Sequence, residues 1–338
     1  MSVSAAIYGL SGPELTPDEK AFFRDAEPWG FILFKRNVDR RKQLSKLCVA
    51  LRDAVGRDAP IFIDQEGGRV QRLRAPHWRD APPAADFGAL YARDPDAGLE
   101  ATRLNHRLLA HELMASGIDA DCAPCLDMRI PEADKVIGDR AYGDDPAVIA
   151  ALGGAAIEGL HAGGVASVIK HIPGHGRADA DSHFALPRVT TSREELEATD
   201  FAPFRALKAA PMAMTAHVVY EAIDPDDPAT LSSEVISSVI RGWMGYDGLV
   251  MTDDLSMQAL SGKFEQRANR AFEAGCDMAL HCNGKRKEMV ALANVMPTLT
   301  GDALRRAKAA EAVRQTPEAL DYKAGLARLD DLLNGQPG

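Results

Sequence analysis

Residues 170–183 hold the densest set of groups that could carry out acid–base chemistry. They read Lys-His-Ile-Pro-Gly-His-Gly-Arg-Ala-Asp-Ala-Asp-Ser-His and include three of the nine histidines of the chain. The glycines and the proline are incompatible with a regular helix, so we expect a long loop after a strand. Asp181 and His183 flank one serine and can meet across a tight turn. A carboxylate beside an imidazole orients the ring and raises its pKa, which suits a general acid/base.

Two further polar stretches follow apolar runs. Residues 64–72 read Asp-Gln-Glu-Gly-Gly-Arg-Val-Gln-Arg, a mixture of carboxylates, amides and guanidinium groups that suits recognition of hydroxyl groups. Two glycines are too few for a phosphate-binding loop. Residues 252–257 contain adjacent carboxylates. We expect Asp253 to face the mouth of the fold and Asp254 to cap the helix that follows.

A metal site is the competing interpretation of the histidine-rich loop. His171, His175 and His183 are of a type that zinc accepts as ligands. Their spacing matches no standard zinc signature. Cys122 and Cys125 form a lone C-x-x-C pair, which we interpret as two small core residues. We therefore expect no metal and no cofactor.

Eight short apolar runs recur along the chain and would position these groups. They are residues 4–10, 30–34, 60–64, 118–123, 165–170, 211–216, 248–252 and 277–280. The runs are continuous rather than alternating, which is typical of strands buried on both faces of a parallel sheet. Strand and helix alternating eight times predict an α/β fold, a single (β/α)8 TIM barrel. A doubly wound open sheet is the alternative, because periodicity alone does not separate the two.

The segments between the runs carry helical signals. Residues 44–55 and 231–243 each present an apolar stripe at helical spacing. Ser192 with Glu195 fits a capping box, and Ser232 is placed to cap a second helix.

We predict a single catalytic domain over residues 1–338. The barrel would occupy about 1–300, and 301–338 would form extra C-terminal helices on the outside or the bottom of the barrel. Chains of this length suit one large α/β barrel.

Polar residues cluster where five of the apolar runs end. In a parallel barrel these ends open onto one face, where barrel enzymes place their chemistry. We expect residues distant in sequence to converge there, namely Asp64, Lys170, His171, His217, Asp253, Asp254, His281 and Asn283.

Composition and charge exclude several classes of protein. The chain has 39 basic and 49 acidic residues, a formal charge of −10, and so lacks the basic surface expected of a nucleic-acid or anionic-membrane binder. Five cysteines show no disulfide framework, which indicates a reducing compartment. The N-terminus is a poor signal peptide, and no apolar run approaches the ~20 residues of a membrane span. We expect a cytoplasmic monomer.

These motifs together resemble glycoside hydrolase family 3, specifically the bacterial single-domain β-N-acetylglucosaminidases of peptidoglycan recycling. The resemblance covers most of the chain up to about Asn283. It is carried by residues 29–37, 62–72, 136–140, 170–183, 214–217 and 250–254. The stretch 170–183 is the most specific of them.

The resemblance implies a role for each matching residue. Asp253 would be the nucleophile that forms a covalent glycosyl-enzyme, and His183 would be the acid/base, with Asp181 as its partner. The hydroxyls and acetamide of the terminal N-acetylglucosamine would be bound by Asp64, Arg72, Arg140, Lys170 and His171.

The resemblance also implies a reaction and a substrate. The enzyme would hydrolyse terminal β-1,4-linked N-acetylglucosamine from GlcNAc-1,6-anhydroMurNAc, with or without peptide, retaining configuration. A histidine acid/base departs from the usual pair of carboxyls. Three alternatives stay open: a metal-dependent amidohydrolase-like barrel, an N-acetylglucosaminide phosphorylase and a non-catalytic sugar-binding barrel.

Overall fold

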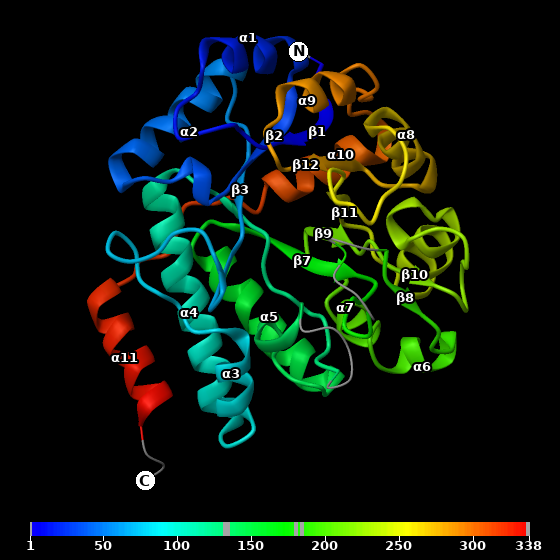
Figure 1. Ribbon diagram of the computed structural model, residues 1–338. Coiled ribbons are helices and arrows are strands. Elements are labelled where there is room, and N and C mark those ends of the chain that lie inside the picture. Colours follow the sequence, from blue (N-terminus) through cyan, green and yellow to red (C-terminus); the bar gives the residue numbers. More distant parts are fainter. Residues whose placement is uncertain (1, 131–135, 179–181, 183–185, 336–338) are drawn as a thin grey trace.

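The computed structural model describes residues 2–130, 136–178, 182 and 186–335, and its centre is a closed barrel of eight parallel strands (Figure 1). The strands are β1 (Ser4–Tyr8), β2 (Pro28–Leu33), β3 (Ile61–Ile63), β6 (Ala120–Asp121), β7 (Ala166–Ile172), β9 (Met212–Thr215), β11 (Leu249–Asp254) and β12 (Met278–His281). Each of the eight predicted runs overlaps one of them. The first strand pairs with both β2 and β12, so the barrel is confirmed and the open sheet is wrong.

The barrel strands are buried on both faces, which explains their continuous apolar sequences. One set of side chains fills the barrel interior, and it includes Ile7, Ile32, Phe62, Val168, Met212, Leu249 and Met278. The opposite set packs against the surrounding helices. All seven residues of β7 are buried, including Lys170 and His171. A lysine and a histidine held at this depth need polar partners there.

Helices cover the outside of the barrel. They are α1 (Pro17–Ala26), α2 (Arg41–Val55), α3 (Ala84–Tyr91), α4 (Pro95–Ser116), α5 (Pro146–Ala162), α6 (Arg193–Ala198), α7 (Ala202–Ala206), the π-helical segment Val235–Trp243, α8 (Phe264–Ala274) and α9 (Arg286–Ala293). Both predicted apolar stripes are buried. Ser232 Oγ accepts the amide of Val235 at 3.0 Å, as predicted. Ser192 caps α6 through the amide of Glu195, whose carboxylate pairs with Arg177 at 3.0 Å.

The two C-terminal helices lie where the sequence places them. Helix α10 (Gly301–Glu311) contributes Ala307 and Ala310 to the core inside the barrel, next to β strands. Trp29, near the start of β2, donates its indole N–H to Glu311 at the end of α10, at 2.6 Å. Helix α11 (Tyr322–Asn334) packs along α4 on the outside (Figure 1). Because α10 covers the amino ends of the strands, the carboxyl ends are left as the open face.

A hairpin that the sequence did not predict follows β3. It consists of β4 (Gln65–Gly67) and β5 (Val70–Gln71), which pair antiparallel. Gly67 has φ +104°, and a Cβ there would lie 2.2 Å from the carbonyl oxygen of Pro82. Only glycine fits this combination of backbone conformation and close approach. A shorter parallel pair, β8 (Arg188–Val189) with β10 (Val219–Tyr220), lies beside the barrel.

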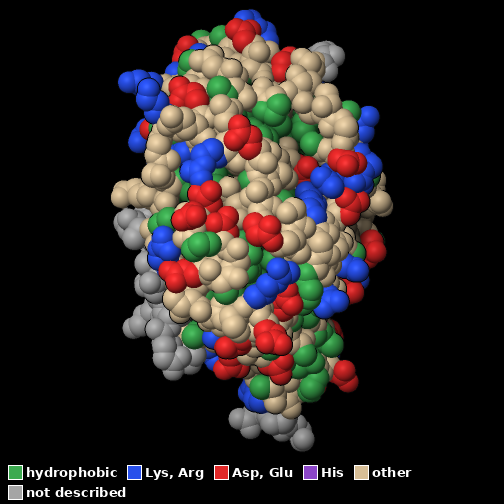
Figure 2. Space-filling view, turned by 90° about the vertical axis from the view of Figure 1, so that its right-hand side faces the viewer, with side chains coloured by type: hydrophobic (Ala, Val, Ile, Leu, Met, Phe, Trp, Pro, Cys, Tyr) green, Lys and Arg blue, Asp and Glu red, His purple; other side chains and the backbone are tan. Residues whose placement is uncertain are grey.

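The surface carries both signs of charge. On the face shown in Figure 2, acidic and basic side chains are interspersed, and apolar side chains are scattered between them. Within the described ranges, Val49 and Val290 are the large hydrophobic residues that are exposed. None of the described helices combines the length and apolar character that a bilayer crossing requires.

Candidate active site

A cavity of about 310 Å³ opens at the carboxyl ends of the barrel strands. This is at the lower end of the range for small-molecule pockets. Seven residues that the sequence singled out line it together: Asp64, Arg72, Arg140, Lys170, His171, Asp253 and Asp254. They come from the ends of β3, β7 and β11, from the chain after β5 and from a short turn at Gly138–Arg140. Because the strands are parallel, the barrel brings together segments that lie up to about 190 positions apart in the sequence.

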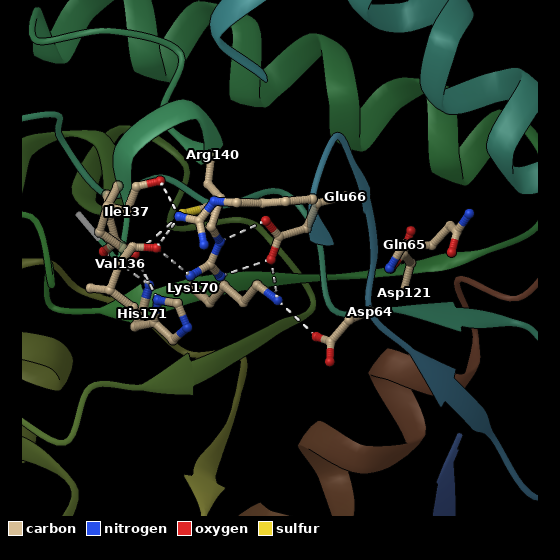
Figure 3. Close-up of polar contacts among 12 residues, drawn as sticks. Asp64, Gln65, Glu66, Asp121, Val136, Ile137, Arg140, Lys170 and His171 are labelled. Atoms are coloured by element: carbon tan, nitrogen blue, oxygen red, sulfur yellow. Dashed lines mark hydrogen bonds and ion pairs between the residues drawn. The ribbon is translucent and has the colours of Figure 1, made fainter. Parts of the chain in front are cut away.

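A buried ion network forms one wall of the cavity. Lys170 Nζ lies 2.8 Å from Asp64 Oδ1 and 2.7 Å from Glu66 Oε1. Arg140 binds both oxygens of Glu66, at 2.8 and 2.9 Å, and Arg72 lies 2.8 Å from Asp64. Figure 3 shows the ammonium of Lys170 between the two carboxylates, with Arg140 facing Glu66. Three cations against two carboxylates leave this wall with one excess positive charge.

The ion pairs keep these groups charged despite their burial. Burial alone would raise the pKa of Glu66, but Arg140 and Lys170 outweigh it and lower the pKa to about 2. Burial opposes a similar shift at Asp64, where Lys170 and Arg72 hold the pKa well below its usual range. Burial would lower the pKa of Lys170, and the two carboxylates raise it instead. At neutral pH the wall is therefore fully ionised and rigidly paired.

Asp121 lies behind this network in a different state. It is fully buried at the end of β6, and burial raises its pKa to about 8. Its Oδ1 accepts the amide of Gln65 at 2.9 Å, whereas Oδ2 has no hydrogen-bond partner among the described residues. A carboxyl with this pKa is mainly neutral at pH 7, so Asp121 adds little negative charge to the wall.

The strand end of β11 orients Asp253. Its Oδ1 accepts the amide of Asp254 at 2.7 Å, and its own amide donates to Thr215 Oγ1 at 3.3 Å. The sequence predicted that Asp254 caps a helix. This prediction is wrong, because the next helix, α8, begins only at Phe264. The Asp254 carboxylate instead accepts the amide and hydroxyl of Ser256 and stabilises the turn after the strand.

Three other polar strand-end residues bind neighbouring elements. His217 contacts Thr230 at 2.7 Å and the backbone oxygen of Asp254 at 3.1 Å, so it supports the end of β11. Burial lowers the pKa of His217, which favours the neutral ring. His281 lies 3.2 Å from Glu288, and Asn283 also donates to Glu288. These three residues lie at or just after the carboxyl ends of β9 and β12, on the face that the sequence predicts, but they are not among the residues that line the cavity.

The proposed acid/base pair, Asp181 and His183, lies outside the described residues. Ser182 between them is buried, and its Oγ lies 3.3 Å from His175 Nε2. Its carbonyl accepts the amide of Ala259 at 3.3 Å. This residue is therefore anchored both to its own loop and to the loop after β11.

The glycines of this loop have packing roles. A Cβ at Gly174 would lie 2.7 Å from the carbonyl oxygen of Asp200, and one at Gly176 would lie 2.2 Å from that of Met128. The hydroxyl of Tyr220 donates to the carbonyl of Gly174 at 2.6 Å. Glycine at these two positions therefore permits close packing of the loop backbone against Met128 and Asp200.

Behind His171 lies a residue that the sequence interpretation did not include, Asp127. Its carboxylate is fully buried and its Oδ2 lies 2.6 Å from His171 Nδ1. The signal for it was weak, because Asp127 stands outside any strand, two positions after Cys125. The sequence analysis also did not identify Glu66 as a site residue, although it lies within the polar stretch 64–72.

One described group, Cys125, Asp127 and His171, could offer a metal three ligand atoms within 4.8 Å of one another. It shares only His171 with the histidine set of the metal alternative. Burial raises the pKa of the Cys125 thiol well above its usual value, so the thiol is a neutral donor to Asp127 at 3.3 Å. These atoms are therefore explained by hydrogen bonds. All five cysteines are free, and Cys122 is a core residue inside the barrel, as expected.

Comparison with known proteins tests the resemblance directly. The family profile described as Glycosyl hydrolase family 3 N terminal domain matches residues 10–315. The chain belongs to glycoside hydrolase family 3. The predicted family and enzyme class are confirmed, and the barrel is the family 3 catalytic fold.

Family 3 relatives match over most of the chain. A β-hexosaminidase of Stenotrophomonas maltophilia (strain K279a) is 39% identical over 281 residues, which are 82% of this chain and 83% of the relative. The crystal structure of NagZ from Neisseria gonorrhoeae superposes with a TM-score of 0.88 at 33% identity and covers 100% of this chain and 99% of that one. A family 3 β-N-acetylglucosaminidase from Paenibacillus sp. str. FPU-7 has a TM-score of 0.85 at 31% identity, with 97% and 67% coverage.

Proposed function

We propose that this family 3 member is a retaining, exo-acting β-N-acetylglucosaminidase whose single catalytic domain spans residues 1–338. The observation that carries the proposal is the shared cavity. It brings Asp253 together with Asp64, Arg72, Arg140, Lys170 and His171, the set of side chains that the family resemblance assigns to nucleophile and sugar. The names of the relatives, β-hexosaminidase and β-N-acetylglucosaminidase, support the same activity.

Asp253 is the nucleophile in this proposal. Its carboxylate attacks the anomeric carbon, the bond from that carbon to the leaving oxygen breaks, and a glycosyl ester forms. Water then attacks the same carbon from the other side, and Asp253 is released, so two inversions give net retention. The hydrogen bond from the Asp254 amide to Asp253 Oδ1 fixes the orientation of the attacking group.

His183 supplies and recovers the proton. It protonates the leaving oxygen in the first step and accepts a proton from water in the second, while Asp181 stabilises the protonated ring. Ser182, the described residue between the two in sequence, is itself held by His175 and by the amide of Ala259.

The ion network binds the terminal sugar. Charged donors and acceptors form stronger hydrogen bonds to hydroxyls than neutral groups do. Lys170 is 3% exposed and cannot swing to another position without separating from two carboxylates. The wall is therefore preorganised, and the entropy of ordering it is lost during folding rather than on binding.

The substrates that we propose are muropeptides that end in GlcNAc β-1,4-linked to 1,6-anhydroMurNAc, with or without peptide. A solved NagZ from Neisseria gonorrhoeae holds N-trifluoroacetyl-D-glucosamine, a sugar of this type. Five free thiols favour a reducing cytoplasm. The scarcity of exposed apolar residues among those described favours a monomer.

Hydrolysis of a nitrophenyl N-acetyl-β-glucosaminide tests the activity, and Asp253→Ala tests the mechanism. We expect this variant to lose several orders of magnitude in kcat, and added azide to restore turnover with an α-linked product, because azide enters from the face that the carboxylate held. Near-normal turnover by Asp253→Ala would remove the residue from the mechanism. Azide without effect, together with a bicyclic intermediate from the substrate acetamide, would indicate a substrate-assisted route.

Two further measurements separate the alternatives. For His183→Ala we expect a larger loss on poor leaving groups than on good ones, because only poor leaving groups need the proton. Equal losses would argue against acid catalysis. Release of sugar 1-phosphate in phosphate buffer would show a phosphorylase, whose incoming anion a histidine repels less than a carboxylate.

A further inference from the structure

A buried carboxylate, Asp127, contacts the end of β7 and the residues that follow it. Its side chain is 0% exposed and does not line the cavity. Oδ2 accepts from the ring Nδ1 of His171 at 2.6 Å and from the Cys125 thiol at 3.3 Å. Oδ1 accepts the amides of His175 at 2.7 Å and His171 at 3.1 Å. Four donors from three residues therefore converge on one carboxylate that touches no substrate.

The charge of Asp127 decides which nitrogen of His171 carries a hydrogen. Burial would raise the pKa of Asp127, but His171 and His175 outweigh it and hold the pKa well below its usual range. An ionised carboxylate accepts hydrogen bonds and cannot donate them. The His171 nitrogen that faces it must therefore be Nδ1–H, whether the ring is neutral or protonated. Because Nδ1 is occupied, Nε2 is the ring atom left for the cavity that His171 lines.

We propose that Asp127 is a positioning residue that fixes the tautomer and the orientation of His171, so that Nε2 is presented to the sugar. The proposal rests on the function proposed above, because the sugar that Nε2 would contact is the substrate of that reaction. The same carboxylate fixes the backbone at His171 and His175, where the loop toward Ser182 begins. The hydrogen bond that one ring nitrogen of a histidine makes determines which of the two nitrogens carries the proton.

The first test needs no variant. In protein labelled with ¹⁵N at histidine, we expect the ring of His171, identified by its absence in His171→Ala, to show a proton on Nδ1. A His171 ring whose only proton is on Nε2 would overturn the proposal. This measurement does not depend on activity. If the protein failed to cleave N-acetylglucosaminides, the proposed function would fall while the tautomer result stood.

The second test is Asp127→Asn, which keeps the shape of the side chain but turns one acceptor into a donor. Its amide would donate to Nδ1 and move the ring proton to Nε2. We expect kcat/KM to fall about 10- to 100-fold, the range typical of removing the hydrogen-bonded partner of a metal-bound histidine. In a His171→Ala background the same substitution should cost less than about 2-fold, because the two residues act as a unit.

Asp119→Asn is the matched control. Asp119 is a second buried carboxylate that accepts a backbone amide, that of Ile61 at 2.8 Å, and it binds Arg52 and Arg314. It lies before β6, at the opposite end of the barrel from the cavity. We expect it to lose thermal stability with kcat/KM within about 2-fold of the native value. Equal fold-losses for Asp127→Asn with and without His171 would show a general structural role and overturn the proposal.

Discussion

Replacing Glu66 by glutamine tests whether the ion network of the cavity wall stabilises the fold. Glutamine has the shape of a protonated glutamate, so the variant measures what ionisation of Glu66 contributes. Its side chain is 8% exposed and its pKa is lowered from 4.5 to about 2. At 1.36 kcal/mol per pKa unit, the difference corresponds to about 3 kcal/mol at pH 7. With an unfolding entropy of about 2 cal/mol/K per residue, the chain would lose about 4 °C in Tm.

The stabilisation that Glu66 provides should depend on pH. A carboxyl with a lowered pKa in the folded state stabilises the protein fully above its unfolded value of about 4.5. That contribution decreases as the pH falls from about 4.5 toward 2, because protons then bind the unfolded chain first. The difference in Tm between native protein and Glu66→Gln should therefore be constant from pH 7 to about pH 5 and shrink below it.

Asp247→Asn is the control, measured by the same thermal unfolding. The pKa of Asp247 is also lowered to about 2, by hydrogen bonds from Arg305 and Arg306, but its side chain is 63% exposed. Solvent screens such pairs, so the cost should stay below about 1 kcal/mol. Equal losses in the two variants, or a loss in Glu66→Gln that does not change with pH, would refute the role assigned to burial.

Three further outcomes are expected. Ser182→Ala removes the contact to His175, a hydrogen bond of about 1 kcal/mol, so kcat on poor leaving groups should fall about 5-fold in steady-state assays. An equal loss on good and poor leaving groups would show that this contact does not support the acid/base step. Arg314→Ala leaves Asp119 with fewer partners and should cost about 1–3 kcal/mol in urea unfolding, with kcat/KM unchanged; loss of activity at unchanged stability would contradict this. Activity should survive dialysis against EDTA, and loss restored by zinc would favour the metal alternative.

Glu66 and Arg140 each neutralise the charge of the other in the cavity wall. Arg140 is 11% exposed, and its guanidinium binds both oxygens of Glu66. Substitution of either residue would leave a buried charge without its main partner, which costs more than the pair contributes when intact. The same reasoning applies to Lys170, which faces Asp64 and Glu66 at once.

Much of the fold is determined by local sequence. Eight continuous apolar runs separated by helical patterns predict a parallel barrel, because strands buried on both faces need apolar residues at every position. The capping residues Ser192 and Ser232 were predictable for the same local reason, since their hydroxyls bind amides three residues away. The hairpin after β3 was not, because its Gly67 is explained by contact with Pro82, 15 positions later.

The candidate active site, like the fold, was predictable from the sequence only in part. The sequence by itself determined that Asp64, Lys170, His171 and Asp253 stand at strand ends, and parallel strands bring such ends to one face. The tertiary structure alone decided which polar side chains enter the cavity: His217 binds the β11 end instead, because Thr230 and the Asp254 carbonyl offer it partners. It also supplied Asp127, which no strand-end pattern indicates. A buried side chain turns toward the partners that satisfy its hydrogen bonds, and those partners come from distant parts of the chain.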